Sequence, residues 1–415
     1  MTLPAEVPAS APDSVLFLAG GPGQAATSLA SFAGASGLRR TRDIVLVDQR
    51  GTGGSNPLEC RFYGPPEHPQ SYFAPFLPLD QVRACREALA SRADLSQYTT
   101  SASVADLEAV RDALGLDRVN LIGLSYGTRL AMEYLRRHER HVRAVVLDGP
   151  VPPSIAMPQD FGRLAQASVD GLLTECLAVP ACASAFPEIR RESREVFRRL
   201  QDSPATVEVA HPDGGAAGRV VLTRDHAAEA IRYMTYVPRS AADVPLVLHR
   251  AYTGDHRPLA DFLIRDRRTG GFDGLYLSIT CAEDVPFLSG DAADRDRDTY
   301  LGFYRVREQR AACAEWPRGR APDWRGVPVT SNVPVLLLTG ALDPVTPPQH
   351  GAEIARTLRN SRQLSVPFAG HSRAGLAGLA CVDAAVRTFV ERADFTGLDP
   401  ACLDSIARPA FSLPR

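Results

Sequence analysis

The stretch Gly123-Leu124-Ser125-Tyr126-Gly127 decides how this chain folds, because it joins a strand pattern to a helix pattern. The apolar run 119–122 before it predicts a buried strand, and the spacing of apolar residues over 125–138 predicts a helix. A serine at such a strand-to-helix turn presents its hydroxyl at the edge of a sheet, and small residues two positions away on either side let the turn close. The pentapeptide therefore marks Ser125 as a candidate nucleophile.

Short apolar runs alternate with amphipathic helical patterns along much of the chain. This alternation predicts the α/β fold class, with a mostly parallel sheet and helices on both of its faces. The runs that we expect to form strands are 15–18, 44–47, 119–122, 142–147, 333–338 and, with a weaker pattern, 363–368.

The alternation is interrupted once, over residues 151–332, which are mainly helical in pattern, polar and punctuated by proline. We expect this segment to be an inserted, mainly helical cap over the carboxyl ends of the strands, where open α/β sheets bind ligands. Residues 1–150 and 333–415 then form the first and the last part of one core.

Composition excludes several functional classes. The chain has 45% apolar and 23% charged residues and a formal net charge of −2, which is ordinary for a globular protein and gives no support for nucleic-acid or membrane-surface binding. No apolar stretch approaches the roughly 20 residues that span a bilayer. The start of the chain shows neither the basic nor the apolar region of a signal peptide.

The eight cysteines suggest disulfide bonds. None forms C-x-x-C or has histidines at zinc-finger spacing, so we expect no metal site, and nothing calls for an organic cofactor. The cysteines fall into successive local pairs, which predicts the bonds Cys60–Cys85, Cys176–Cys182, Cys281–Cys313 and Cys381–Cys402. Eight buried thiols in a cytosolic enzyme are the alternative.

A serine nucleophile needs a base that is itself oriented by a carboxylate, and the chain offers both in the order Ser, Asp, His. Asp343 follows the apolar run 333–338, and His371 follows the run 363–368. Because the carboxyl ends of parallel strands meet at one edge of a sheet, we expect Ser125, Asp343 and His371 to meet there.

Acyl transfer also needs N–H donors for the developing oxyanion. The N–H of Tyr126 directly follows the candidate nucleophile and is one candidate donor. The second is expected from the loop Ala19-Gly20-Gly21-Pro22-Gly23, where glycine allows the backbone to approach a substrate.

Three motifs together resemble the α/β-hydrolase family of proline iminopeptidases: G-G-P-G from Gly20, D-Q-R-G-T-G-G-S from Asp48 and G-L-S-Y-G-T from Gly123. The blocks I-T-C-A-E-D from Ile279 and L-T-G-A-L-D-P-V-T-P from Leu338 are similar to its secreted branch, the tripeptidyl-aminopeptidase-like serine peptidases. The resemblance implies an α/β-hydrolase fold. Its implied site comprises Ser125 as nucleophile, Asp343 as orienting acid, His371 as base, and Gly21 and Tyr126 as oxyanion donors.

Two departures from the family pattern stand out. Ala19 occupies the place where family members usually carry histidine. Only fourteen residues precede Val15, although family members have further strands before this point, so we expect the first strands and an export signal to be missing. The cysteine pairs and the resemblance together imply a periplasmic or secreted protein.

The substrate class is the least constrained expectation. Glu283 and Asp284 are adjacent acids within the inserted segment, and we expect them, Glu283 above all, to bind the ammonium of a peptide with a free N-terminus. Arg50 in the D-Q-R motif is expected to be structural, to hydrogen-bond the glycine-rich loop and to pair with Asp48. The leading function is a serine aminopeptidase. The alternatives are a carboxylesterase with the same triad and a catalytically silent binding protein.

Overall fold

The computed structural model describes residues 1–7, 12–64, 68–212, 217–268 and 271–414. Within them, a seven-stranded sheet forms the core in the order β1-β3-β2-β4-β5-β8-β9. Its strands are β1 (Thr2–Leu3), β2 (Ser14–Leu18), β3 (Ile44–Leu46), β4 (Val119–Leu124), β5 (Val142–Asp148), β8 (Val335–Gly340) and β9 (Ser361–Val366). Every neighbouring pair is parallel except β1 with β3.

The expected α/β fold is confirmed, and each of the six predicted strands lies in this sheet with ends displaced by at most two residues. Near-continuous apolar runs are typical of strands that are buried on both faces. In β2, Val15 and Phe17 pack into one layer, whereas Leu16 and Leu18 pack into the layer on the opposite face.

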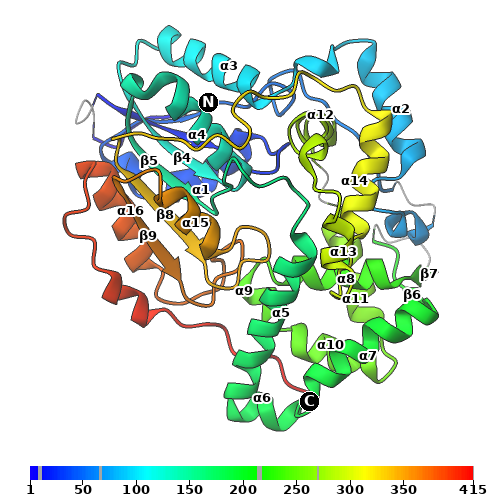
Figure 1. Ribbon diagram of the computed structural model, residues 1–415. Coiled ribbons are helices and arrows are strands. Elements are labelled where there is room, and N and C mark those ends of the chain that lie inside the picture. The colour runs from blue at the N-terminus through cyan, green and yellow to red at the C-terminus, as the bar shows by residue number, and fades with distance from the viewer. Residues whose placement is uncertain (8–11, 65–67, 213–216, 269–270, 415) are drawn as a thin grey trace.

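Helices cover both faces of the sheet (Figure 1). One layer includes α1 (Ala30–Ala35) and α16 (Ala380–Arg392), and the other includes α3 (Thr100–Ala113), α4 (Tyr126–His138) and α15 (Pro348–Ala355). Seven short 3-10 helices occur among the described residues: Ala26–Leu29, Leu38–Arg40, Pro69–Phe73, Leu95–Gln97, Glu139–His141, Val285–Phe287 and Pro400–Ser405.

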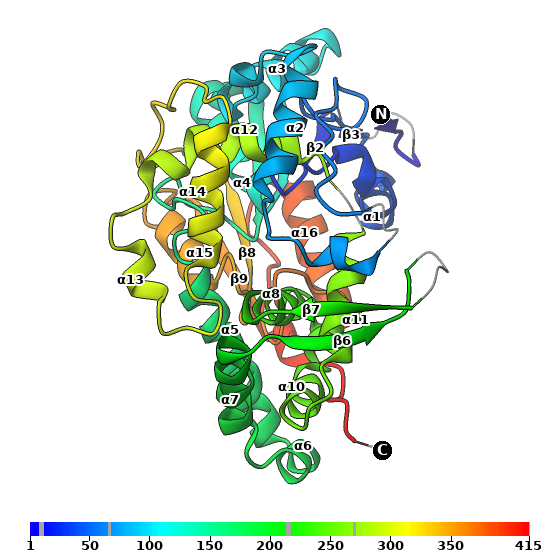
Figure 2. The same cartoon turned by 90° about the vertical axis from the view of Figure 1, so that its right-hand side faces the viewer.

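A second, mainly helical body is inserted between β5 and β8, and we propose residues 151–332 as the cap from this arrangement. Its helices are α5 (Phe161–Ala178), α6 (Pro180–Ala185), α7 (Ile189–Asp202), α8 (Arg224–Met234), α9 (Pro238–Ala241), α10 (Val244–Tyr252), α11 (Arg257–Arg267), α12 (Asp273–Glu283), α13 (Ala292–Asp296) and α14 (Tyr304–Glu315). The sequence pattern did not predict its antiparallel hairpin, β6 (Ala205–Val209) and β7 (Gly218–Leu222), which Figure 2 shows projecting from the body.

One helix from the first part of the chain, α2 (Leu79–Ala90), packs against α12 and α14 of the cap. Their shared apolar cluster includes Leu58, Leu89, Leu275 and Trp316. The cap is therefore held to the core by packed side chains as well as by the two segments through which the chain enters and leaves it.

All four predicted disulfides are present, namely Cys60–Cys85, Cys176–Cys182, Cys281–Cys313 and Cys381–Cys402. The alternative of eight free thiols is therefore wrong. Among the described helices, none combines the length and apolar character that a membrane crossing requires.

Candidate active site

The backbone at Ser125 adopts φ 53° and ψ −120°, an unusual conformation for a residue with a side chain. Its N–H donates to the carbonyl of Asp148, 2.8 Å away, at the end of the neighbouring strand β5. A Cβ atom at Gly123 would collide with the backbone of Gly127, and one at Gly127 would collide with the carbonyl of Leu18. The two glycines of the pentapeptide therefore let α4 begin directly beside the ends of β2 and β4.

The structure brings Ser125, His371 and Asp343 into one hydrogen-bonded line. His371 Nε2 lies 2.9 Å from Ser125 Oγ, and His371 Nδ1 lies 2.8 Å from Asp343 Oδ2. Asp343 is held by the N–H groups of Val345 and Thr346, both on Oδ1, and by the Thr346 hydroxyl on Oδ2 at 2.7 Å. This geometry allows proton transfer from the serine hydroxyl to the imidazole.

Electrostatics in this line favour charge separation between His371 and Asp343. Burial alone lowers the pKa of His371, but the adjacent Asp343 carboxylate offsets the burial and raises the pKa above its ordinary value of 6.5. Burial alone raises the pKa of Asp343, but His371 and the hydrogen bonds from Thr346 together lower it below 3.8. An imidazolium that forms during a reaction would therefore be stabilised by a carboxylate that stays ionised.

The two expected oxyanion donors lie beside Ser125. Gly21 has a φ of 107°, and a Cβ atom at its neighbour Gly20 would lie 3.2 Å from the Ser125 Cβ. Tyr126 is the first residue of α4, so its N–H has no partner inside the helix. Within the described part of the chain, neither the Gly21 N–H nor the Tyr126 N–H donates a hydrogen bond.

Glu283 is almost fully buried, at 1% exposure, and its partners are protein groups. It accepts hydrogen bonds from the N–H and the hydroxyl of Thr100, at 2.7 and 2.6 Å, and the Tyr126 hydroxyl lies 2.8 Å from the same Thr100 hydroxyl. Burial raises the pKa of Glu283 to about 7. These contacts connect the end of α12 to the start of α3 and give Glu283 no free face for a substrate.

Asp284 is also buried, with 0% exposure. Its two oxygens accept from the guanidinium of Arg129 on α4, at 3.0 and 3.1 Å, and one of them also accepts from the N–H of Met157. Both acids, which the sequence led us to expect at a substrate ammonium, fasten the cap to the core helices in this structure.

Arg50 makes structural contacts, as expected. It does not make them with the glycine-rich loop or with Asp48, which were its expected partners. It pairs through two bonds of 2.6 Å with Asp106 on α3 and donates to the carbonyl of Gln97. Asp48 instead accepts from the N–H and hydroxyl of Thr27 and from the N–H of Gly54.

Sequence reasoning missed two groups that hold the site. Thr346 bridges Asp343 and the His371 ring, with its hydroxyl 3.1 Å from His371 Nδ1. Arg373, two residues after His371, makes two bonds of 2.7 Å with the carboxylate of Asp148. Of the two, only Thr346 could have been predicted from the sequence. It stands three residues after Asp343, a spacing that is typical of side chains within one turn.

Aromatic side chains of the cap border His371. The ring of Tyr236 lies edge-on to the imidazole, with centroids 5.1 Å apart, and Tyr233 lies 5.1 Å from Tyr236. The buried guanidinium of Arg232 donates to the Tyr236 hydroxyl at 2.6 Å and lies 4.3 Å from the ring of Phe161. This packing fixes the aromatic wall next to the candidate base.

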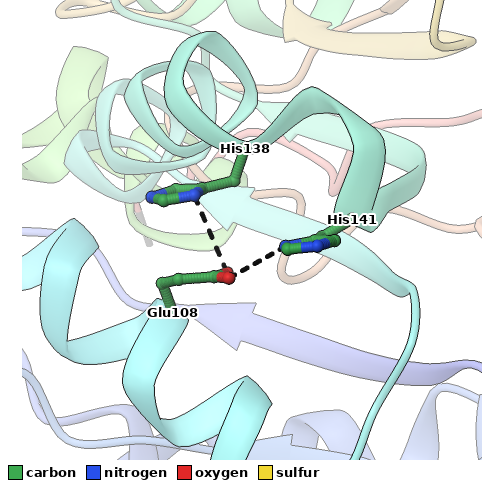
Figure 3. Close-up of side chains that lie close together, drawn as sticks. All are labelled: Glu108, His138 and His141. Carbon is green, nitrogen blue, oxygen red and sulfur yellow. Dashed lines mark ion pairs between the residues drawn. The ribbon is translucent and has the colours of Figure 1, made fainter.

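A second group of titratable side chains lies away from this line, on α3, at the end of α4 and in the 3-10 helix Glu139–His141 that follows α4. Figure 3 shows Glu108 facing His138 and His141, with Nδ1 to carboxylate distances of 3.9 and 2.8 Å. Both Glu108 oxygens also accept from the Arg111 guanidinium, at 2.9 and 3.0 Å, and one accepts from the Tyr134 hydroxyl. A carboxylate already bound to a fixed cation is a poor metal ligand, so we interpret this group as an ion-pair network.

Two family models match the chain: the alpha/beta hydrolase fold over residues 13–201 and the TAP-like protein family over residues 300–402. Serine protease Hip1 of Mycobacterium tuberculosis is 25% identical over 315 residues, which cover 69% of this chain and 58% of that protein. The tripeptidyl aminopeptidase of Streptomyces lividans is 25% identical over 394 residues, which cover 87% and 70%.

Among solved structures, the proline iminopeptidase of Mycobacterium smegmatis aligns with a TM-score of 0.46 and 17% identity over 95% of this chain and 94% of that one. The chain spans less than two thirds of the length of Hip1. The match to the alpha/beta hydrolase model and the observed sheet show that the chain has the α/β-hydrolase fold, and residues 300–402 match the TAP-like protein family. Relatives of the chain are named as a serine protease and a tripeptidyl aminopeptidase.

Proposed function

We propose that this protein is a serine peptidase that cleaves peptides from a free N-terminus, as a prolyl or tripeptidyl aminopeptidase does. The observation that carries the proposal is the line from Ser125 Oγ through His371 to Asp343, with distances of 2.9 and 2.8 Å. In this proposal Ser125 is the nucleophile, His371 the general base and acid, and Asp343 the group that orients the imidazole.

The chemistry follows from these positions. Ser125 Oγ attacks the scissile carbonyl while His371 Nε2 takes its proton, and the N–H groups of Gly21 and Tyr126 donate to the oxyanion. His371 then gives the proton to the departing amine, which leaves an acyl-enzyme at Ser125. A water molecule, deprotonated by His371, hydrolyses this ester and releases the N-terminal fragment.

Peptides are favoured over other acyl compounds by the relatives, which are named as a serine protease and a tripeptidyl aminopeptidase. We also propose that the protein acts in an oxidising compartment, periplasmic or secreted. Four disulfides support this, because such bonds persist in oxidising compartments and are rare in the cytosol.

The test is a panel of fluorogenic amides that carry one to three residues, each with a free or an acetylated N-terminus, beside short acyl esters. We expect wild-type protein to release the fluorophore from free-amine peptides, and Ser125→Ala to lose this activity. Ser91→Ala, at an exposed serine after α2, is the matched control and should retain it. Cleavage of esters alone, or equal cleavage of acetylated peptides, would contradict the proposal.

A further inference from the structure

The first turn of α12 lies directly on the loop that carries the proposed oxyanion donor. The N–H of Phe272 donates to the carbonyl of Gly23 at 3.3 Å. A Cβ atom at Gly23 would lie 2.9 Å from the Phe272 carbonyl oxygen and 3.8 Å from the Tyr276 nitrogen. The residues that begin α12 are therefore neighbours of the loop beside Ser125.

Asp273 is the first residue of α12 and differs from the other acids around the site. Glu283, Asp284 and Asp148 each accept hydrogen bonds from protein donors. Asp273, which is partly exposed, accepts no hydrogen bond and forms no ion pair with any residue in the described ranges. Burial raises the pKa of Asp273 to about 7, with no cation to offset it.

A carboxylate in this position is costly to ionise, because it has given up part of its water and received no donor in exchange. A cationic ligand would supply the missing partner. The acids nearby that are already paired cannot do this, which leaves Asp273 as the available anionic group next to the loop Gly20–Gly23.

Aromatic side chains lie near this part of α12. Tyr276, three residues after Asp273 and thus on the same face of α12, packs its ring against Phe76 with centroids 6.2 Å apart. Burial raises the pKa of the Tyr63 phenol, and the nearby charge of Asp273 adds to the increase. Tyr63, Phe76 and Tyr276 all retain some exposed surface. The guanidinium of Arg305 lies 3.5 Å from the Phe76 ring centre, and that of Arg267 lies 4.3 Å from the Tyr63 ring centre. These two rings are therefore already partnered by cations, and the Asp273 carboxylate is the group left to attract an ammonium.

We propose that Asp273 binds the free α-ammonium of the peptide substrate and thereby imposes the requirement for an unblocked N-terminus. This inference rests on the proposed peptidase function and assigns the amine-binding role to Asp273 in place of Glu283. It also predicts a pH effect. Because the carboxylate must be ionised to bind the ammonium, KM for free-amine peptides should fall as the pH rises through about 7.

The test compares Asp273→Asn with Asp117→Asn on one free-amine fluorogenic peptide, its acetylated form and p-nitrophenyl acetate. Asp117 is an exposed aspartate just before β4, at the end of that strand opposite to Ser125. We expect Asp273→Asn to raise KM for the free-amine peptide by about 10- to 100-fold and to remove its fall with pH. Hydrolysis of the ester should stay within about twofold, which also shows that the variant is folded, and Asp117→Asn should match wild type.

Two outcomes would overturn the inference, and they are distinguishable. If wild-type protein prefers free-amine peptides and Asp273→Asn keeps that preference, the assignment of Asp273 is wrong while the peptidase function stands. If wild-type protein cleaves free and acetylated peptides equally well, the proposed function fails as well. Asp273→Ser serves as a second variant and should reproduce the loss of preference.

Discussion

The carboxylate of Asp148 and the guanidinium of Arg373 form two parallel hydrogen bonds, each 2.7 Å long. The carbonyl of the same Asp148 accepts the N–H of Ser125 at 2.8 Å. Arg373 is two residues after His371 in the chain. The backbone of Asp148 therefore holds the turn at Ser125, and its side chain holds the loop that carries His371, so both segments are attached to the end of β5. The distance between Ser125 Oγ and His371 Nε2 thus depends on a group outside the line itself.

Arg373→Leu should lower kcat by about tenfold or more while changing KM little, because a displacement of the imidazole by about 1 Å is costly to catalysis. Arg373→Lys should recover only part of the rate, since lysine cannot make two parallel bonds. The measurement is steady-state kinetics on a free-amine peptide. Arg50→Leu removes a similar pair with Asp106 and should leave kcat unchanged; an equal loss in both variants would mean that the effect is general destabilisation.

Much of the fold and of the proposed site could be predicted from the sequence, for physical reasons that particular residues illustrate. Strands such as 119–122 are apolar because both faces are buried, and the order of Ser125, Asp343 and His371 follows strand ends that meet at one edge. The disulfide pairs joined cysteines that are close in sequence, where loop closure is short.

What could not be predicted depends on contacts between distant segments. The sequence presents Glu283 and Asp284 as adjacent acids, and nothing local indicates that Thr100 and Arg129 will cover them. Likewise, Asp273 looks like an ordinary residue at a helix start until the absence of a partner in the described structure sets it apart.

Gly127→Ala should strongly destabilise the protein. Its new Cβ atom would overlap the carbonyl of Leu18, which is backbone inside the sheet and cannot move aside. Thermal unfolding followed by circular dichroism measures the effect, which we expect to exceed about 3 kcal/mol. Gly290→Ala is the control, because its Cβ atom would meet nothing within 4 Å; similar melting temperatures for the two variants would contradict the packing argument.

The pH dependence of hydrolysis should reflect His371. The Asp343 carboxylate raises the pKa of His371 above 6.5, so the rate should decline as the pH falls through a value above 6.5, where the base becomes protonated. The substrate for this measurement is an acyl ester that has no amine. The pH profile then contains no contribution from a substrate ammonium or from the carboxylate that binds it. Asp343→Asn should reduce kcat by about a thousandfold or more and move the acid limb to lower pH. If the acid limb of the pH–rate profile is at the same pH in Asp343→Asn as in wild type, a group other than His371 determines it.

Acid stability should depend on Glu108. Burial opposes ionisation of this carboxyl, but Arg111 and Tyr134 outweigh burial and lower its pKa from 4.5 to about 2. The stabilisation is therefore present above pH 4.5 and is lost as the pH falls towards 2. Glu108→Gln should lower the urea midpoint at pH 7 and flatten its decline between pH 5 and about 2.

The matched control for this measurement is Glu87→Gln, whose exposed carboxylate is 3.5 Å from Arg86. It should unfold like wild type at every pH, because exposed ion pairs contribute little. If the urea midpoint of Glu108→Gln changes with pH as it does in wild type, the ion pairs of Glu108 do not contribute to stability in acid.

The proposed function depends most on Ser125 being the nucleophile that forms an acyl-enzyme, and one measurement tests this directly. The protein is incubated with a fluorophosphonate, and its intact mass and peptide map are determined while peptidase activity is followed. We predict one adduct per chain, located on Ser125, with activity falling in proportion to labelling and no adduct in Ser125→Ala. An adduct on a different residue, or full peptidase activity in the Ser125-labelled protein, would contradict the account.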